Sequence, residues 1–203
     1  MVITPENVQY FCESVQIAHD NGAKQFSFTF IIDNDGAEEK DLAYLQKHDP
    51  VKLVSGFISQ IDKLSAITDD WWVEYSFPMC VYTEEQLKLL KGRLATPCQI
   101  HLKNAVTFNT KMELLPCDMY IYQQLGKFGR DFSSYQGFLS LTESANYNKT
   151  MDEIRKLPSD ECTACEHFSV CYGGCPVLWK NYSFAALKEF KAKGPLNSGF
   201  SGE

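Results

Sequence analysis

The sequence lacks the features of several large classes of protein. No apolar run approaches the ~20 residues needed to cross a bilayer, so we expect no membrane partner. The first residues, 1–7, have neither the basic start nor the apolar stretch of a secretion signal. Positive charge is scarce, because 19 Lys and Arg face 26 Asp and Glu for a net charge of -7. A nucleic-acid partner is therefore not expected, and the chain is predicted to be soluble and cytoplasmic.

Common catalytic patterns are missing as well. The sequence has no Ser-His-Asp pattern, nucleophile elbow or glycine-rich phosphate loop. Its four histidines are scattered. Only His167, inside a cysteine-rich segment, merits a test as a ligand, and an exposed loop histidine is its simpler interpretation.

Cysteine, in contrast, is plentiful. The chain has eight, and most of them lie after residue 95. In a reducing cytosol, clustered cysteines more often bind metal or do redox chemistry than form disulfides. Cys12 is an exception, because it falls within an apolar helical stripe and is predicted to be a core residue. The densest run is C-x2-C-x5-C-x3-C, formed by Cys162, Cys165, Cys171 and Cys175.

This run has the features of a thiolate metal site. A C-x2-C turn lets two sulfurs converge on one metal, and Gly173-Gly174 supplies backbone that tolerates positive φ. Pro176 directly after the last cysteine is typical of bacterial ferredoxin runs. A structural zinc site usually has two separated knuckles, whereas only the first pair here is one. Iron–sulfur is therefore favoured, with zinc, two disulfides or four buried thiols as alternatives.

The first half of the chain alternates helix and strand signals. Helices are expected over 5–20 and about 49–64, and strands over 25–32 and 72–77, which predicts an α/β fold with a parallel sheet. The series opens on a helix and shows only two strands. It therefore resembles the tail of a larger sheet or barrel, completed by another chain or by missing upstream sequence. Trp71, Trp72 and Tyr75 are expected in the core rather than at a barrel mouth.

Shorter elements are expected in the rest of the chain. Residues 33–36 are predicted to form a polar turn rather than a calcium loop, because no later ligand positions fit. Thr83 begins a capping box for a helix to about Lys91. The remaining predictions are a β-hairpin from 105–109 and 113–115, helices at about 150–157 and 184–191, and disorder after Gly194.

The cysteine run with its Gly-Gly resembles the SPASM domain, the C-terminal auxiliary-cluster module of many radical S-adenosylmethionine (SAM) enzymes. Cys98 and Cys117 match the earlier pair of that pattern, although Met112 stands where the family usually has glycine. The first half resembles the last βα units of the radical SAM partial barrel. The resemblance implies three regions. They are residues 1–94, the end of the partial barrel; 95–193, a small cysteine-rich α+β SPASM domain; and 194–203, a disordered tail.

By this resemblance the chain would hold two auxiliary [4Fe–4S] clusters whose ligands interleave along the sequence. One would take Cys98, Cys117 and Cys175, and the other Cys162, Cys165 and Cys171. Each then lacks one ligand. Cys80 is a candidate for the first cluster, and a packed strand-end thiol is an equal alternative. For the second, Asp118, Asp160, Glu161, His167, water, substrate or an open iron remain as alternatives.

The C-x3-C-x2-C motif that binds the SAM-cleaving cluster is absent. The resemblance therefore predicts a chain that cannot cleave SAM alone, either a C-terminal fragment or a split enzyme with a separate SAM-binding half. SAM would bind only in the complete enzyme, and the substrate would be a ribosomal peptide or a protein side chain, as in sulfatase maturation. Whether this chain is itself an enzyme stays open. The alternatives are a zinc-binding interaction module and a small electron carrier, and the barrel-like first half weakens the latter.

Overall fold

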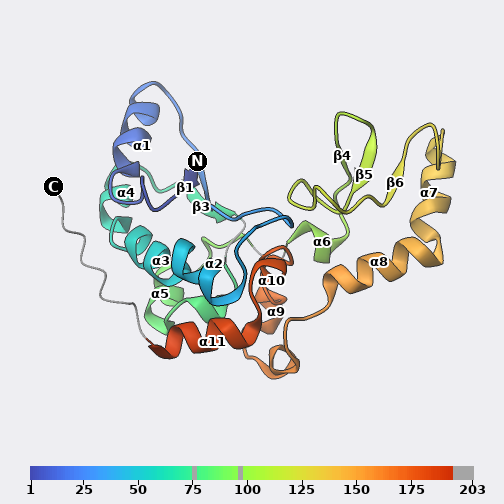
Figure 1. Cartoon of the computed structure of the whole chain (residues 1–203). Coiled ribbons are helices and arrows are strands. Elements are labelled where there is room, and N and C mark those ends of the chain that lie inside the picture. Colours follow the sequence, from blue (N-terminus) through green and yellow to red (C-terminus); the bar gives the residue numbers. More distant parts are fainter. Residues whose placement is uncertain (75–76, 96–97, 194–203) are drawn as a thin grey trace. The chain divides into compact units, whose positions relative to one another are not determined.

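The computed structural model describes residues 1–74, 77–95 and 98–193 (Figure 1). The chain is a mixed α/β protein with two small sheets. Its residues divide into two units, which are described separately. The first contains Met1–Ile32, Glu39–Thr96 and Tyr182–Glu203, and the second contains Asp33–Glu38 and Pro97–Asn181. The boundaries expected at 94 and 193 stay predictions, and Tyr75 and the tail after residue 193 lie outside the described residues.

The first unit is built on a parallel sheet in the order β1-β2-β3. The strands are β1 (Val2–Ile3), β2 (Phe26–Phe30) and β3 (Trp71–Glu74). Ile3 pairs with Phe30, and Phe28 pairs with Val73. The expectation of only two strands, with a helix first, was wrong. A two-residue strand such as β1 is too short to show a period of two in the sequence.

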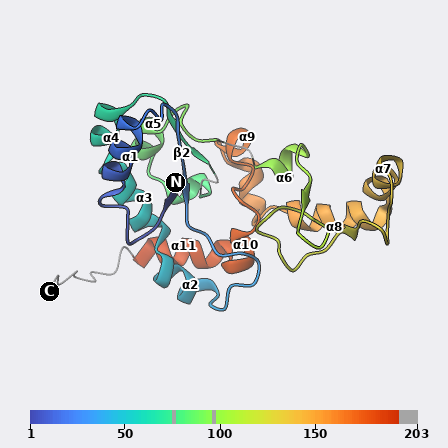
Figure 2. The ribbon, with the colours of Figure 1, turned by 90° about the horizontal axis from the view of Figure 1, so that it is seen from above.

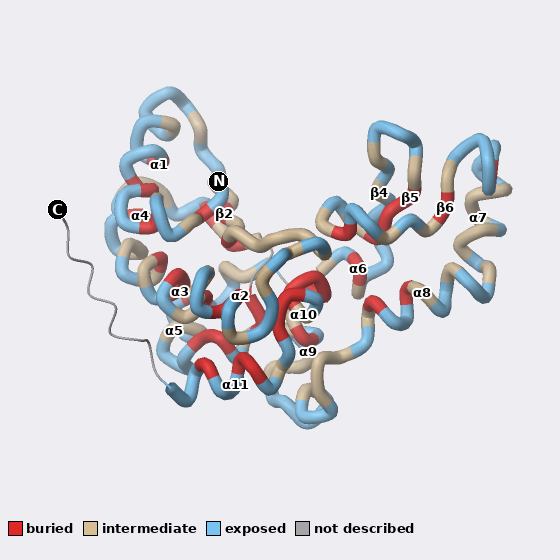
Figure 3. The backbone as a smooth tube through the Cα atoms, in the orientation of Figure 1, coloured by how far each residue is buried: buried red, intermediate tan, exposed pale blue. Residues whose placement is uncertain are grey.

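Helices pack around this sheet through an aromatic core. They are α1 (Phe11–Asp20), α2 (Asp41–His48), α3 (Pro50–Ile58), α4 (Ile61–Ile67), η1 (Met79–Val81), α5 (Glu84–Leu89) and α11 (Phe184–Lys193). The rings of Phe11, Phe28, Phe30, Phe57 and Trp71 contact one another, with centroids 5.2 to 6.3 Å apart. Figure 3 shows buried backbone along β2, α3 and α11. The predicted core positions of Cys12 and Trp71 are confirmed, at 0% and 3% exposure.

The first helix begins later than the sequence predicted. Residues 5–10 form turns, and α1 starts at Phe11. The side chain of Asn7 explains the delay, because it donates to the carbonyl of Val2 at 2.8 Å and accepts from the amide of Thr4 at 2.9 Å. Such side-chain bonds to the backbone compete with helix formation. Asn7 thereby ties the start of the connection back to β1.

Two further helical predictions need correction. The single helix expected over 49–64 is two helices, because α3 ends at Ile58 and α4 begins at Ile61. At the break, the hydroxyl of Ser59 donates to the carbonyl of Gly56 at 2.7 Å. Helix α2 was not expected at all. It lies beside α11 (Figure 2), and the carboxylate of Asp41 at its start accepts the amide of Ser183 at 2.7 Å.

The second unit holds an antiparallel sheet and several short helices. Its elements are α6 (Gln99–Leu102), β4 (Thr107–Phe108), β5 (Glu113–Leu115), β6 (Gly126–Lys127), α7 (Tyr135–Glu143), α8 (Ala145–Arg155), η2 (Asp160–Ala164), α9 (Phe168–Cys171) and α10 (Leu178–Asn181). The predicted hairpin is confirmed, since β4 pairs antiparallel with β5. Strand β6 and helix α7 were not expected. In the part of the chain that the structure describes, no helix is long and apolar enough to span a bilayer.

The polar turn after β2 belongs to the second unit. The carboxylate of Asp35 accepts the amides of Ile121 and Tyr122, at 3.1 and 3.4 Å. The amide of Asp35 in turn donates to the carbonyl of Met119 at 3.1 Å. These hydrogen bonds connect Asp35 to the loop that follows Cys117. The prediction of a turn at 33–36 is confirmed.

Candidate metal centres

The six cysteines of the second unit all lie in or beside tight turns. Cys98 precedes α6, Cys117 follows β5, and Cys175 precedes α10. Cys162 lies in η2 and Cys171 ends α9. All eight cysteines of the chain fall within the described residues, and none of them forms a disulfide.

Three of these cysteines, which we call the inner group, interact with one another. They are Cys98, Cys117 and Cys175. Burial raises the pKa of Cys175 to about 12, and the nearby charges of Cys98 and Cys117 add to that rise. Burial likewise raises the pKa of Cys117 to about 11, with further contributions from Asp118 and Cys98. The structure thus brings together three thiols that are up to 77 positions apart in sequence (175 minus 98).

Each inner-group sulfur is hydrogen-bonded by backbone amides in the same way. The donors are the amides two and three positions after the cysteine. They are Ile100 and His101 for Cys98, Met119 and Tyr120 for Cys117, and Val177 and Leu178 for Cys175. Amides aimed at a sulfur favour the thiolate and, in a metal site, tune the bound group.

The local backbone explains why these amides converge. Each cysteine carbonyl accepts the amide three positions later, which closes a turn around the sulfur: His101 to Cys98 at 2.9 Å, Tyr120 to Cys117 at 3.2 Å and Leu178 to Cys175 at 3.1 Å. Such a turn aims the amides two and three positions on at one side of the chain. Burial of the thiols opposes ionisation while the amides favour it, so the sites suit sulfur that is ionised by a metal.

The remaining three cysteines, Cys162, Cys165 and Cys171, form a second set, which we call the outer group. Burial raises the pKa of Cys162, and Cys171 and Cys165 are among the neighbours that raise it further. Cys165 is exposed, whereas Cys162 and Cys171 are half-buried. The amide of Cys165 donates to the carbonyl of Cys162 at 3.2 Å, as expected for a C-x2-C turn. The outer group is therefore the more accessible of the two.

A buried tyrosine lies next to the inner group. Tyr120 is 1% exposed, and its hydroxyl has no hydrogen-bond partner among the described residues. Burial raises its pKa, and Cys175, Cys117, Asp35 and Cys98 raise it further. A buried hydroxyl without an acceptor costs free energy. An acceptor such as a metal-bound sulfur would remove that cost, so Tyr120 fits a loaded inner group. The sequence gives no local signal for this contact, which depends on the fold.

The candidates for the missing ligands are distributed over both groups. Asp118 raises the pKa of Cys98 and of Cys117, so its carboxylate lies near the inner group, whereas Glu161 raises the pKa of Cys162 in the outer group. The sequence interpretation offered Asp118 only as a ligand of the cluster held by Cys162, Cys165 and Cys171. Cys80 lies in η1 of the first unit, where its carbonyl accepts the ammonium of Lys191. Its role as a ligand stays a prediction, as do those of Asp160 and His167.

A histidine that the sequence did not single out has the features of a ligand. Burial lowers the pKa of His101, while a hydrogen bond to the backbone of Gly174 opposes that change. Its Nε2 atom is buried with no partner among the described residues. Its ring packs against Tyr172, with centroids 5.8 Å apart. A metal-binding imidazole often donates from one ring nitrogen to a backbone carbonyl and binds the metal through the other.

Comparisons with known proteins give a structural likeness and no match in sequence. No family model matches the sequence, and no curated protein matches it. A solved structure described as native anSMEcpe with bound AdoMet and Cp18Cys peptide is similar, at 16% identity and a TM-score of 0.49. The match covers 97% of this chain and 55% of that one, so this chain spans about half the length of the structure it matches. At this level the likeness identifies neither the activity nor the substrate of this chain.

Proposed function

We propose that the chain is the auxiliary-cluster part of a radical SAM peptide or protein maturase. The inner group would hold one iron–sulfur cluster and the outer group a second. The observation that supports this proposal best is the division of six cysteines into two groups of three. The division matches the interleaved ligand sets implied by the resemblance to the SPASM domain, and it separates Cys171 from Cys175 although they lie in one short run.

The donor set favours clusters over other thiolate chemistry. Thiolates are the ligands of iron–sulfur clusters, and the paired amides would stabilise their negative charge. When bound, such clusters supply electron transfer or a binding position for substrate. The chain's own part is to exclude water from the inner group, where Cys175 is 6% exposed, and to leave the outer group accessible at Cys165.

Radical initiation would lie elsewhere in this proposal. The chain has no C-x3-C-x2-C triplet, so SAM would be bound and cleaved by a separate part of the complete enzyme. The parallel sheet β1-β2-β3 with its covering helices is consistent with the last units of a partial barrel, which would contribute to the substrate side. The substrate class proposed is a peptide or a protein side chain.

Metal analysis of cysteine variants tests this proposal. After anaerobic reconstitution with iron and sulfide, we expect about eight of each per chain, as two four-iron clusters require. Cys175→Ala should lose the inner cluster and Cys165→Ala the outer one, so each variant keeps about half of the iron. Cys12→Ala is the matched control, because Cys12 is buried in the first unit and should keep all the iron.

Two outcomes would contradict the proposal. A colourless chain with about one zinc would instead support a structural zinc module. Complete loss of iron in both single variants, with folding intact by circular dichroism, would show that the cysteines do not form two separate sites.

A further inference from the structure

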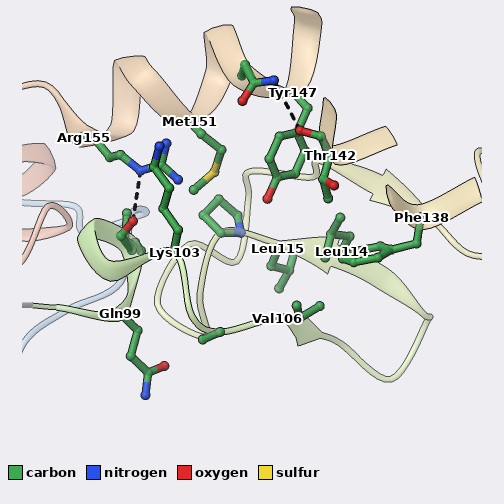
Figure 4. A pocket seen from close by; sticks show the side chains of 14 residues that line it. Gln99, Lys103, Val106, Leu114, Leu115, Phe138, Thr142, Tyr147, Met151 and Arg155 are labelled. Carbon is green, nitrogen blue, oxygen red and sulfur yellow. Dashed lines mark hydrogen bonds between the residues drawn. The ribbon is translucent and has the colours of Figure 1, made fainter. Parts of the chain in front are cut away.

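A pocket in the second unit lies beside the inner group but contains none of its cysteines. It has a volume of about 270 Å³ and lies between the α6–β5 segment and helices α7 and α8 (Figure 4). Gln99 and Pro116, which line it, are direct neighbours of Cys98 and Cys117 in sequence. The volume is just below the range of about 300–1,000 Å³ typical of small-molecule sites. It therefore suits a single side chain with one polar group.

Two cations line one end of the pocket, and no acidic residue is among those that line it. In Figure 4 the side chain of Lys103 points toward Arg155. The absence of acid is notable in a chain with a net charge of -7. Two neighbouring cations repel each other unless an anion lies between them.

Arg155 is largely buried and only partly satisfied. Its side chain is 16% exposed, and its Nε donates to the carbonyl of Ile100 at 2.9 Å. Its Nη1 lies 3.6 Å from Asp152, a residue with 76% side-chain exposure, so this ion pair is long and open to solvent. Guanidinium donors therefore remain available to an acceptor in the pocket.

Lys103 and Tyr147 add further donors. Among the described residues, the ammonium of Lys103 has no hydrogen-bond or ion-pair partner. Tyr147 also lines the pocket, and its hydroxyl is a further donor; burial raises its pKa, and the positive charge of Arg155 opposes that rise. Lys103 and Arg155 can donate to one anion, and a carboxylate accepts several such bonds at once.

Apolar side chains also line the pocket. They are Val106, Leu114, Leu115, Phe138 and Met151. In Figure 4 Leu114, Leu115 and Phe138 lie away from Arg155, whereas Met151 lies beside it. An inorganic anion would leave this apolar surface uncovered. A ligand that carries a carboxylate next to an apolar group would use both parts.

We propose that this pocket binds the C-terminal residue of a peptide, with its carboxylate at Lys103 and Arg155 and its apolar side chain against Leu114, Leu115 and Met151. The proposal rests on the proposed peptide-modifying function for its choice of ligand. A free apolar carboxylic acid has the same chemistry, so the test separates the two sources. The peptide is favoured because the hydroxyl of Tyr147 and the side-chain carbonyl of Asn148, two further lining residues, can bond to a peptide group.

Calorimetry on the full chain tests the site directly. The probes are N-acetyl-leucine, N-acetyl-leucinamide, 4-methylpentanoate and inorganic phosphate. We expect the acid to bind about tenfold or more tightly than the amide, as charge-assisted hydrogen bonds imply. Lys103→Gln should remove most of that difference, leave amide binding unchanged and preserve the fold, because Lys103 is exposed. Lys149→Gln, on the same helix as Arg155 and outside the pocket, is the matched control and should bind like the wild type.

Each contrary outcome has a distinct meaning. Equal binding of acid and amide would overturn the carboxylate assignment, and phosphate binding as tight as N-acetyl-leucine would overturn the role of the apolar wall. If 4-methylpentanoate binds as tightly as N-acetyl-leucine, the ligand is a small acid and the peptide assignment is wrong. Iron content is measured on the same samples. Failure of cluster assembly with intact acid binding would contradict the proposed function alone. Normal cluster assembly without acid binding would contradict the pocket proposal alone.

Discussion

Replacing Tyr120 by phenylalanine should have opposite effects on the chain with and without a cluster. The side chain is buried beside three thiols, and its hydroxyl has no partner among the described residues. In the metal-free chain, the buried hydroxyl carries a desolvation penalty of about 1–3 kcal/mol. Tyr120→Phe removes that penalty and loses no hydrogen bond. We therefore expect the metal-free variant to be more stable than the wild type by about 1 kcal/mol.

In the loaded chain the hydroxyl would donate to a cluster sulfur. A donor stabilises the reduced cluster more than the oxidised one, because the reduced cluster carries more negative charge. Both states are charged, so only part of a charged hydrogen bond, about 0.5–1 kcal/mol, distinguishes them. With ~59 mV per factor of ten for one electron, the potential of the inner cluster should fall by about 20–40 mV in the variant. The outer cluster should be unaffected.

The two effects are measured separately. Urea unfolding of the metal-free chain gives the stability difference, and a potentiometric titration followed by electron paramagnetic resonance gives the two potentials. Tyr135→Phe is the matched control, because Tyr135 is 74% exposed on α7. An unchanged or raised potential would refute the placement of the hydroxyl at a cluster. Loss of one iron per chain would show that Tyr120 is a ligand, and a less stable metal-free variant would show that the hydroxyl has an acceptor of its own.

Three other substitutions test a backbone conformation, a side-chain hydrogen bond and a helix cap outside the two cysteine groups. Met112→Gly should stabilise the chain by about 1 kcal/mol in urea unfolding, because Met112 has a φ of 59° that favours glycine. Asp41→Ala should cost about 0.5–1 kcal/mol at neutral pH, since its carboxylate accepts the amide of Ser183. Hydrogen bonds from Ser183 lower the pKa of Asp41 below its ordinary value of 3.8, so this stability is present above that value and is lost as the pH falls further. Wild type and variant should therefore converge in acid. Thr83→Ala should cost about 1 kcal/mol in thermal unfolding without changing the iron content, because it removes the capping box completed by Gln86.

Local signals in the sequence predicted several elements well. The capping box at Thr83 begins α5 as expected, and α11 covers the helix predicted near the end of the chain. Strand β2 lies within the aromatic run predicted to be a strand. In these segments the residues that specify the element are neighbours in the chain, so pattern and structure agree.

Other elements depend on partners far away in the sequence. Strand β1 has two residues and is defined by its pairing with β2, and the start of α1 is set by the contact of Asn7 with that strand. Helix α7 has no buried residue, and it was not expected from the sequence. Asp35 was correctly placed in a turn, but its bonds to the loop after Cys117 connect residues 86 positions apart. Such contacts leave no local signature.

Met112 stands where the resembled family has glycine, and its backbone adopts a conformation that favours glycine. The resemblance placed a glycine at this position, five residues before Cys117. The backbone of Met112 adopts a φ of 59°, the conformation that glycine takes without steric cost. The hairpin still forms, with the amide of Met112 donating to the carbonyl of Asn109 at 3.0 Å. The substitution therefore costs stability without removing the turn that leads into Cys117.

The backbone between Cys171 and Cys175 explains how two neighbouring cysteines come to lie in different groups. In a continuous helix, residues four apart lie on one face, so their sulfurs would meet at one metal. Here Tyr172, Gly173 and Gly174 all have positive φ, at 49°, 84° and 77°, so the helical conformation ends with α9 at Cys171. Cys171 therefore remains with Cys162, while Cys175 interacts with Cys98 and Cys117. The two glycines are thus needed for the division of the six cysteines, and a spacing of four residues alone would have suggested one site.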